Sequence, residues 1–420
     1  MIDLSQYVTG FAGLARLLES GIDFSELGPR LEARSRSDPS DANALMDLST
    51  LMLMTGNPDL RELAFKKQHQ ALQISRIYRL PPTTAAVALR LLVIMAPGDM
   101  TANTPVDCLL EDTDIEVTLF YLFPGRPFPE SLPDHDLIFV AIGESDQSQA
   151  LLGQLEGLPG LSTKPVLNSP DKIGHLTRDR VSLLLQSIPG VVIPPTARVD
   201  RQVLLEISQE RFALAEILDA GRFPIIARPV ASHGGKNLAK IDDAADLSTY
   251  VAALSDGEFY ISNFIDYRST DGQFKKYRVV LLAGQPFACH MAISSHWMIH
   301  YFNADMASSD FKRKEEEHFM NNFEQEFALT HKQSLASIDR LIGLDFVVID
   351  CAETKDGSLL LFEVDNAAIV HALDDPKLFP YKRAQMQRVF AAFREMLFAR
   401  GRAGEDGKPA SPNPLTRRIM

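Results

Sequence analysis

The chain has 420 residues, of which 45% are hydrophobic and 23% charged, a composition typical of a soluble globular protein with two or three domains. Its formal net charge of −13 argues against a nucleic-acid partner, because proteins that bind nucleic acids usually present basic surfaces. Neither a membrane span nor a secretory signal is expected, and the separated cysteines Cys108, Cys289 and Cys351 fit a reducing, cytoplasmic location without disulfides or zinc.

Residues 1–87 are predicted to be helical. The segment DPSDANALMDLSTLMLMTG begins with capping residues, places Leu and Met at helical spacing and stops at Gly56. A second amphipathic pattern, LRELAFKKQHQALQISRIY, ends before Pro81 and Pro82. The pair resembles one tetratricopeptide-type hairpin, although solenoids need about three repeats. We interpret the region as a helical cap on the rest of the chain, with a docking module for a partner as the alternative.

Residues 88–170 predict a parallel α/β domain. Continuous apolar runs are typical of buried parallel strands, and here they are LRLLVIMAPG, IEVTLFYL, HDLIFVAIG and the shorter KPVLNSP. Segments with helical potential, such as SQALLGQLEGL, separate these runs. The glycines of APGDMTANTP do not form a GxGxxG fingerprint, so a dinucleotide site is not supported.

Residues 171–400 predict a third unit whose strands are joined by short turns, for example through Gly284 in LLAGQPF. Such turns favour antiparallel pairing. The expected fold class is therefore α/β, changing to α+β in the C-terminal part. Residues 401–420 are rich in Gly, Pro and charge and predict a disordered tail.

Three acidic residues indicate a metal site. Asp350 closes the apolar strand LDFVVID, whereas Glu363 and Asp365 alternate on LLLFEVDN and so face one side of a sheet. A hairpin between the two strands would bring Asp350 beside them. Such oxygen ligands suit a hard cation such as Mg²⁺, which usually completes its shell with substrate phosphates. The alternative is a set of solvated carboxylates on an exposed face.

The segment FPIIARPVASHGGKNLAKI suggests a phosphate site. Arg228 stands at a strand end before the loop SHGGK, in which Gly234 and Gly235 let the backbone approach a phosphate closely. The Walker pattern G-x-x-x-x-G-K-[ST] is absent from the sequence. Further along, FYISNFIDY offers a strand end whose backbone groups can read an adenine edge.

The order of these features resembles the ATP-grasp superfamily, in particular glutathione synthetase and the ribosomal-protein glutamate ligases, over residues 88–400. The resemblance implies a pre-ATP-grasp domain at 88–170 and an ATP-grasp domain at 171–400, with subdomains at about 171–258 and 259–400. The segments that carry it are LNSPDKIGHLTRDRVSLLL, FPIIARPVASHGGKNLAKI, FYISNFIDY, YRVVLLAGQPF and IDCAETKDGSLLLFEVDN.

The resemblance also implies a set of site residues. The ATP-binding residues would be Arg180, Arg228, Ser232, His233, Gly234, Gly235, Lys236, Ser262, Asn263, Phe264 and Ile265. The ligands of Mg²⁺, or of Mn²⁺ in its place, would be Asp350, Glu363 and either Asp365 or Asn366. The catalytic residue would be Arg278, with substrate contacts from His300, Tyr301 and Asn303 of SSHWMIHYFNADM. For that last segment, packing of its aromatic side chains in a core is the alternative. The neighbouring FKRKEEEHF is predicted to be a solvated helix face, with a mobile cover over the site as the alternative.

The sequence departs from the family pattern at two places. Both phosphate-binding lysines of the family are arginines here, at positions 180 and 228. Arginine keeps the charge and can donate two hydrogen bonds to a phosphate, so ATP binding is expected to persist. The acidic residue usually found two positions before the catalytic arginine is Lys276, which leaves Asp266 or Asp271 for the ribose contact.

The activity that the resemblance implies is ATP-dependent ligation of a carboxylate to an amine through an acyl phosphate. ATP, a carboxylate and an amine or peptide are the expected partners, and a homo-oligomer is left open. Two alternatives remain: a non-catalytic ATP-binding scaffold that recruits a partner through its N-terminal helices, and an ATP-dependent phosphotransferase. The presence of Arg278, Asp350 and Glu363 argues against the scaffold.

Overall fold

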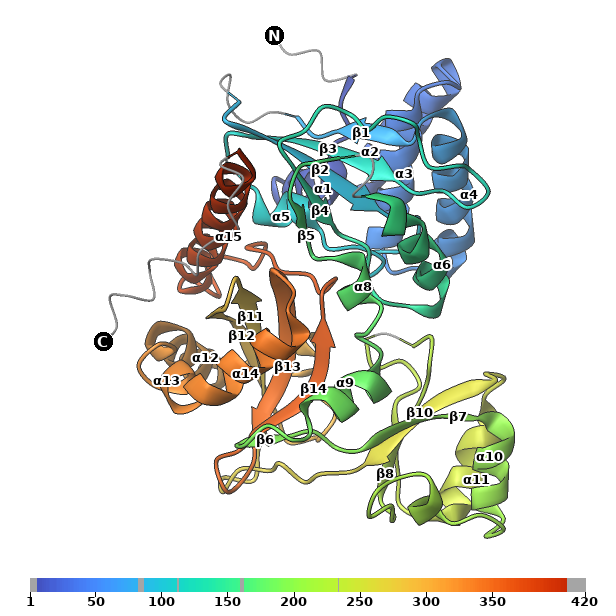
Figure 1. The fold of residues 1–420 in the computed structure, drawn as a ribbon, viewed down its shortest axis with the longest axis vertical. Coiled ribbons are helices and arrows are strands. Elements are labelled where there is room, and N and C mark those ends of the chain that lie inside the picture. The colour runs from blue at the N-terminus through green and yellow to red at the C-terminus, as the bar shows by residue number, and fades with distance from the viewer. Residues whose placement is uncertain (1–5, 82–86, 112, 159–161, 233, 406–420) are drawn as a thin grey trace. The chain divides into compact units, whose positions relative to one another are not determined.

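The computed structural model describes residues 6–81, 87–111, 113–158, 162–232 and 234–405. The described residues form helices and three sheets, which confirms the α/β class (Figure 1).

Two compact units are each assembled from separate stretches of the chain. Unit 1 comprises Met1–Ile173, Asn366–Asp375 and Met386–Met420, within the described ranges, and unit 2 comprises Gly174–Asp365 and Pro376–Gln385. The helical region and the first α/β region, which the sequence divides at residue 87, therefore lie in one unit. Most of the two segments expected to form ATP-grasp subdomains, about 171–258 and 259–400, lies in unit 2, but residues 171–173, 366–375 and 386–400 belong to unit 1.

The described part of unit 1 begins with four helices: α1 (Gly10–Glu19), α2 (Phe24–Ser37), α3 (Ala42–Met54) and α4 (Pro58–Ile74). The two helices predicted from the sequence are confirmed as α3 and α4. The side chains of Asp23, Asp41 and Asn57 accept backbone N–H bonds at the starts of α2, α3 and α4, as capping residues do. Leu14 and Leu48 pack in the core between the helices.

A buried carboxylate, that of Asp47, and a half-buried one, that of Asp107, join α1 to the rest of unit 1. The Asp47 side chain on α3 accepts the N–H of Thr9 at 2.9 Å, and Asp107 accepts the N–H of Ala12 at 2.8 Å. Residues after α4 are not helical as predicted, because β1 (Ile77–Arg79) pairs antiparallel with β3 (Ile115–Tyr121).

The sheet of unit 1 has the order β1-β3-β2-β4-β5, with β2 (Leu89–Met95), β4 (Leu137–Val140) and β5 (Val166–Leu167). The pairs β2–β3, β2–β4 and β4–β5 are parallel, as the apolar runs predicted. Shorter elements between the strands are α5 (Val106–Leu109), α6 (Asp146–Gln154), η2 (Leu155–Gly157) and α8 (Pro170–Ile173).

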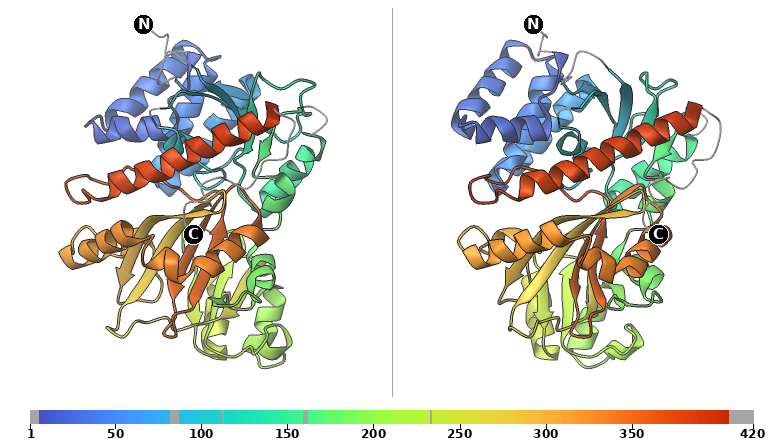
Figure 2. Two further views of the ribbon diagram at one scale, coloured as in Figure 1. Left: turned by 60° about the vertical axis from the view of Figure 1, so that its left-hand side comes forward. Right: turned by 90° about the vertical axis from the view of Figure 1, so that its left-hand side faces the viewer.

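The long C-terminal helix α15 (Lys382–Glu405) packs on this sheet, as Figure 2 shows. Phe393 meets Phe139 of β4 edge to face at 5.6 Å, and Arg394 binds Asp114 through both its Nε and Nη2 atoms. Gly401 is buried in the helix, so the helix includes the first residues of the segment predicted as a disordered tail.

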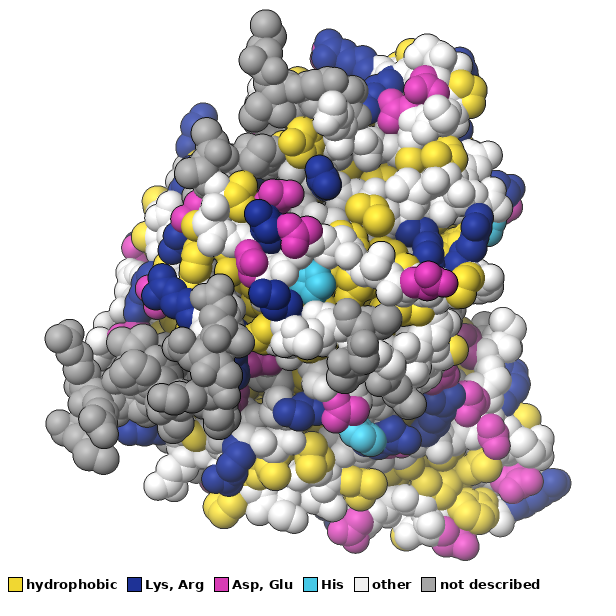
Figure 3. Space-filling model, turned by 45° about the horizontal axis from the view of Figure 1, so that its top comes forward, with side chains coloured by type: hydrophobic (Ala, Val, Ile, Leu, Met, Phe, Trp, Pro, Cys, Tyr) yellow, Lys and Arg dark blue, Asp and Glu magenta, His cyan; other side chains and the backbone are white. Residues whose placement is uncertain are grey.

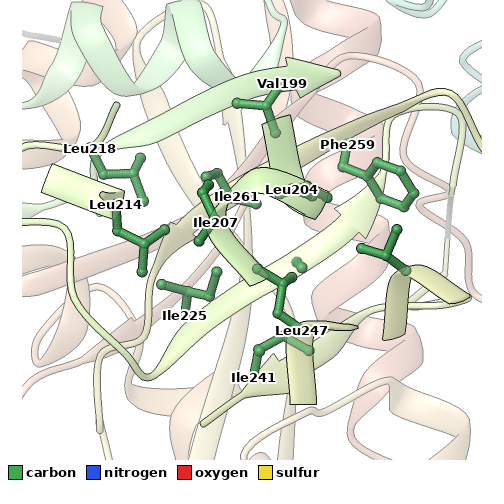
Figure 4. Packing of buried hydrophobic residues seen from close by; sticks show 12 residues of the cluster. Val199, Leu204, Ile207, Leu214, Leu218, Ile225, Ile241, Leu247, Phe259 and Ile261 are labelled. Carbon is green, nitrogen blue, oxygen red and sulfur yellow. The ribbon is translucent and has the colours of Figure 1, made fainter. Parts of the chain in front are cut away.

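The first sheet of unit 2 has the order β7-β10-β8-β9. Its strands are β7 (Thr196–Asp200), β8 (Ile225–Pro229), β9 (Ala239–Ile241) and β10 (Glu258–Asn263), and its neighbours are α9 (Arg178–Leu185), α10 (Arg201–Ser208), η3 (Leu214–Glu216) and α11 (Ala244–Ala253). Side chains from α10, α11 and the strands, including Leu204, Leu247 and Phe259, meet in one apolar core (Figure 4).

The second sheet of unit 2 has the order β12-β11-β13-β14-β6. Its strands are β6 (Val191–Val192), β11 (Phe274–Leu282), β12 (Gln285–Ser294), β13 (Phe346–Glu353) and β14 (Leu359–Asp365). The other elements are η4 (Tyr301–Asn303), α12 (Asp310–Asn322), α13 (Phe327–Thr330) and α14 (Lys332–Ile342). The pairs β11–β12 and β13–β14 are antiparallel and joined by short turns, as predicted, β11 also pairs antiparallel with β13, and β6 joins β14 in parallel.

Among the described helices, none combines the length and the apolar character needed to cross a bilayer. On the face seen in Figure 3, basic and acidic side chains are interspersed rather than separated into large areas of one sign.

Candidate functional site

Charged and titratable side chains form a row across the second sheet of unit 2. His290 on β12 lies opposite Arg278 on β11, and Arg278 lies opposite Asp350 on β13. Asp350 in turn lies opposite Glu363 on β14, which confirms that the hairpin brings these two carboxylates together. Because directly opposite residues of antiparallel strands share one face, we call His290, Arg278, Asp350 and Glu363 the charged row.

Regular strand pairing is interrupted beside the charged row. The register of β11 and β12 shifts directly after Arg278, and that of β13 and β14 shifts directly after Asp350. Bulges of this kind bend a strand and redirect its side chains, and they are frequent next to active sites. Arg278 and Asp350 therefore stand at the irregular centre of an otherwise regular sheet.

Two cations bind the carboxylate of Asp350. Arg278 donates from Nε to Oδ1 at 2.7 Å and from Nη2 to Oδ2 at 3.0 Å, while Lys276 Nζ donates to Oδ2 at 2.8 Å. The Asp350 side chain is only 5% exposed. Burial by itself would raise the pKa of Asp350, but attraction to Arg278 and Lys276 holds that pKa well below its usual range. Asp350 is therefore an ionised carboxylate with both oxygens engaged.

Glu363 is paired with Arg178 of α9, a helix next to the first sheet of unit 2. Arg178, in the first turn of α9, donates to Glu363 Oε1. Burial opposes ionisation of Glu363, but Arg178 and Arg228 outweigh it and lower the pKa of Glu363. This ion pair links the charged row to the start of α9.

Arg228 lies buried at the end of β8 and holds the start of that loop. Its Nε donates to Ser232 Oγ at 3.1 Å, its Nη2 donates to the Ser232 carbonyl, and Ser232 Oγ donates to the carbonyl of Pro229 at 2.7 Å. Burial, together with the nearby Arg178, lowers the pKa of Arg228 to about 10. At neutral pH Arg228 is thus a cation whose orientation is set by the backbone that it holds.

The loop after Arg228 contains residues that require positive φ angles. Gly234 has φ 60° and Gly235 has φ 75°, conformations that glycine adopts without strain. A Cβ on Gly235 would lie 3.3 Å from Met298 Sδ, so the loop and the segment around residue 298 approach closely. Lys236 is exposed in this loop. His233, which the sequence predicted as an ATP contact, lies outside the described residues.

The segment with His300, Tyr301 and Asn303 lies against the same loop. Asn303 Oδ1 accepts the N–H of His300 at 2.9 Å and so holds the segment's bend. The His300 ring comes to 3.8 Å from the place of a Cβ on Gly234. Burial, with the nearby Lys276 and Arg278, lowers the pKa of His300. His300 is therefore neutral at pH 7 and close to both cations that bind Asp350.

Tyr301 belongs to a buried polar network centred on Glu316 of α12. The Glu316 side chain, at 0% exposure, accepts from Tyr301 Oη at 3.1 Å and Tyr381 Oη at 2.7 Å, and lies 3.3 Å from Lys382 Nζ. Lys382 Nζ also donates to Tyr301 Oη and stands 4.2 Å from the centre of its ring. The prediction of a solvated helix face for FKRKEEEHF is wrong for Glu316, because its partners come from segments distant in sequence.

The strand end predicted to read adenine lies at the end of β10. Ser262 and Asn263 pair with Ile226 and Ile225 of β8, and the Phe264 N–H donates to the carbonyl of Pro224 at 3.1 Å. The Phe264 ring meets Trp297 edge to face, with 5.8 Å between the ring centres. Lys240 Nζ stands 5.1 Å from the centre of the Phe264 ring. Ile265 follows as a half-buried residue.

Asp365 and Asn366 differ in their surroundings. Asp365 ends β14, two residues after Glu363. Asn366 is fully buried in unit 1, where its Nδ2 donates to the Ile142 carbonyl at 2.9 Å and its carbonyl accepts from Thr104 Oγ1 at 2.6 Å. The Nδ2 of Asn366 is thus engaged within unit 1, whereas its Oδ1, the atom that would bind a metal, is buried without a hydrogen-bond partner among the described residues, so Asp365 and Asn366 both stay candidates for the third ligand.

Arg180, predicted to bind phosphate, has an exposed side chain that donates to the Gly174 carbonyl at 3.0 Å. The arginine that pairs with Glu363 is Arg178, which the sequence analysis did not select. Lys382, Glu316 and His290 were missed as well. The signal for Arg178 was present, since HLTRDR contains two arginines and neighbours two apart on a helix point in different directions.

The donor set suits a hard divalent cation, because carboxylate oxygens are the ligands that Mg²⁺ prefers. Asp350 and Glu363 stand on adjacent strands, with Asp365 one step along the same strand face. Nevertheless, no group of three or more His, Cys, Asp or Glu side chains in the described ranges is arranged to hold a metal ion. Arg278, Lys276 and Arg178 now take up the carboxylate oxygens that a metal would need.

Comparisons with known proteins give structural similarities alone. No protein-family model and no curated protein matches the sequence. Among solved structures, the chain is similar to D-alanine–D-alanine ligase from Bacillus anthracis complexed with ATP, with 16% identity and a TM-score of 0.46 over 77% of this chain and 100% of that one. The corresponding ligase from Coxiella burnetii has 12% identity and a TM-score of 0.48 over 76% and 97%. A RimK domain ATP-grasp protein from Sphaerobacter thermophilus has 15% identity and a TM-score of 0.43 over 74% of this chain and 99% of that one.

Proposed function

We propose that unit 2 binds ATP and uses it to ligate a carboxylate to an amine. The observation that carries the proposal is the gathering of four cations, Arg178, Arg228, Lys276 and Arg278, around the carboxylates of the charged row and the start of the glycine-bearing loop. This surplus of positive charge, set partly out of water, suits the phosphates of a nucleotide. Ser232, Gly234, Gly235 and Lys236 would add loop contacts to those phosphates.

Arg278 and His300 would take part in the two steps of the reaction. The substrate carboxylate attacks the γ-phosphorus of ATP, giving an acyl phosphate and ADP, and the amine then displaces phosphate to form the amide. Arg278 neutralises the charge that develops on the transferring group, which is effective because its orientation is already fixed by Asp350. His300, neutral and close to Arg278, accepts the proton that the amine loses.

Mg²⁺, held by Glu363 with Asp365 or Asp350, would neutralise phosphate charge and polarise the γ-phosphoryl group. The end of β10, from Ser262 to Ile265, would hold the adenine.

The test has two steps. Purified chain is incubated with ATP, Mg²⁺ and pools of carboxylates and amines, and ADP release that requires both pools identifies the substrates. The active carboxylate is then labelled with ¹⁸O, and one label should appear in the released phosphate, because that oxygen forms the bond to phosphorus. ADP release that needs the carboxylate but no amine would instead indicate a phosphotransferase. The absence of ATP binding by calorimetry, with Mg²⁺ present, would refute the proposal.

A further inference from the structure

Lys276 is placed where it competes with a divalent metal for Asp350. The Lys276 side chain is 15% exposed and its Nζ lies 2.8 Å from Asp350 Oδ2, which also accepts from Arg278. A carboxylate oxygen offers about two acceptor positions, so Oδ2 is filled by these two donors. A metal that bound Asp350 in this state would also stand next to two positive charges.

The two cations differ in how easily they can leave. Arg278 bonds both oxygens of Asp350 through a planar fork, whereas Lys276 bonds one oxygen from the end of a flexible four-carbon stem. Lys276 is therefore the exchangeable partner. Its flexible stem lets the ammonium group turn from Asp350 to a bound phosphate, while Arg278 stays in place.

We propose that Lys276 makes metal binding conditional on nucleotide: it occupies Asp350 in the nucleotide-free protein and transfers to the phosphates when nucleotide and metal arrive together. The inference rests on the proposed ATP-binding function. At an effective dielectric constant of about 20, two unit charges about 4 Å apart interact strongly enough to change an affinity more than a hundredfold. Removing the charge of Lys276 should therefore have a large effect on binding of the metal alone.

The experiment measures Mn²⁺ binding to the full-length protein by electron paramagnetic resonance, without nucleotide and with a non-hydrolysable ATP analogue. Wild type should bind Mn²⁺ weakly alone and much more tightly with the analogue. Lys276→Met, which keeps the stem and removes the charge, should bind Mn²⁺ alone at least about tenfold more tightly than wild type. Lys276→Arg keeps the charge and should behave like wild type.

A further variant locates the effect. Adding Asp350→Asn to Lys276→Met should abolish the gain in Mn²⁺ affinity, and a gain that persists would place the metal elsewhere and overturn the proposal. Equal Mn²⁺ affinities of Lys276→Met and wild type would overturn it too. If Lys276→Met does not fold, as judged by circular dichroism, wild type decides: Mn²⁺ binding as tight without the analogue as with it is incompatible with the proposal. If the analogue does not bind at all, the proposed ligase function is refuted. The Mn²⁺ affinities of wild type and Lys276→Met without nucleotide would then still show whether Lys276 competes with the metal for Asp350.

Discussion

Replacement of Lys382 by methionine tests the buried ion pair in unit 2. Methionine keeps the apolar stem but leaves Glu316, at 0% exposure, without its cation. Removing one partner of a buried pair typically lowers the free energy of unfolding by about 3–5 kcal/mol, because the remaining charge is uncompensated. Tyr301, Tyr381 and the N–H of Met291 still bond Glu316, so we expect a loss near the lower end, about 3 kcal/mol.

The loss should depend on pH. Burial already raises the pKa of Glu316 despite the attraction of Lys382, and without that attraction the pKa rises further. A group whose pKa is higher in the folded than in the unfolded state contributes stability below its unfolded pKa and loses it as the pH rises through the folded value. The defect of Lys382→Met should therefore be small near pH 4 and grow toward pH 8.

Tryptophan fluorescence during guanidinium titration measures this effect selectively. Trp297 is the only tryptophan in the sequence and lies in unit 2, so its signal reports the unfolding of that unit. The matched control is Lys275→Met, since Lys275 pairs with Glu315 at 2.9 Å in a more exposed setting and should contribute less than about 1 kcal/mol. Equal losses for the two variants, or a loss for Lys382→Met that does not change between pH 5 and 8, would refute the reasoning.

Further predictions concern the charged residues of both units. Glu363→Gln keeps the size of the side chain but removes a carboxylate of the charged row, and should lower ADP release about a hundredfold or more in a protein with unchanged circular dichroism; near-normal turnover would contradict the assignment. Arg228→Ala should lower ATP affinity and turnover about ten- to a hundredfold, and Arg228→Lys should lower them less, as binding and ADP-release assays would show. Arg178→Ala should weaken nucleotide binding more than Arg180→Ala does, and calorimetry giving the reverse order would favour the position inferred from the family. Burial raises the pKa of Asp47 to about 6, so the stability that it contributes below about pH 4 is lost as the pH rises through 6. The melting temperature of Asp47→Asn, measured by calorimetry, should therefore change less between about pH 4 and pH 6 than that of wild type. An equal pH dependence of the two melting temperatures would contradict the raised pKa of Asp47.

The strands of unit 2 were predictable because their apolar runs are continuous and end at acidic or turn residues. The run from Phe346 to Glu353 is buried except at its end, as a central strand should be. Once two such runs are joined by a short turn, the meeting of Asp350 and Glu363 follows from antiparallel pairing. This part of the site could be predicted because it depends on two strands that are neighbours in the sequence and on the short turn between them.

The features that the sequence did not predict depend on which side of a helix faces the site, or on contacts with residues distant in sequence. Arg178 and Arg180 differ by about 200° around α9, and only the packing of that helix decides which one meets Glu363. The burial of Glu316 is equally hidden, because α12 reads as a polar helix until Lys382 and its neighbouring tyrosine are folded against it. Likewise, the helical pattern in the sequence extends into the residues of β1, which form a strand in the structure because they pair with β3.

The interrupted course of unit 1 bears on how the protein is made. Its sheet is complete in the chain by Ile173, but the helix that packs on Phe139 begins its contribution only at Met386. A ribosome that adds about 5–20 residues per second needs roughly 10–40 s to cross that interval. During this time nearly all of unit 2 emerges and can fold, while the older sheet stays exposed to chaperones and proteases. The part of the molecule that is synthesised first is thus among the last to be finished.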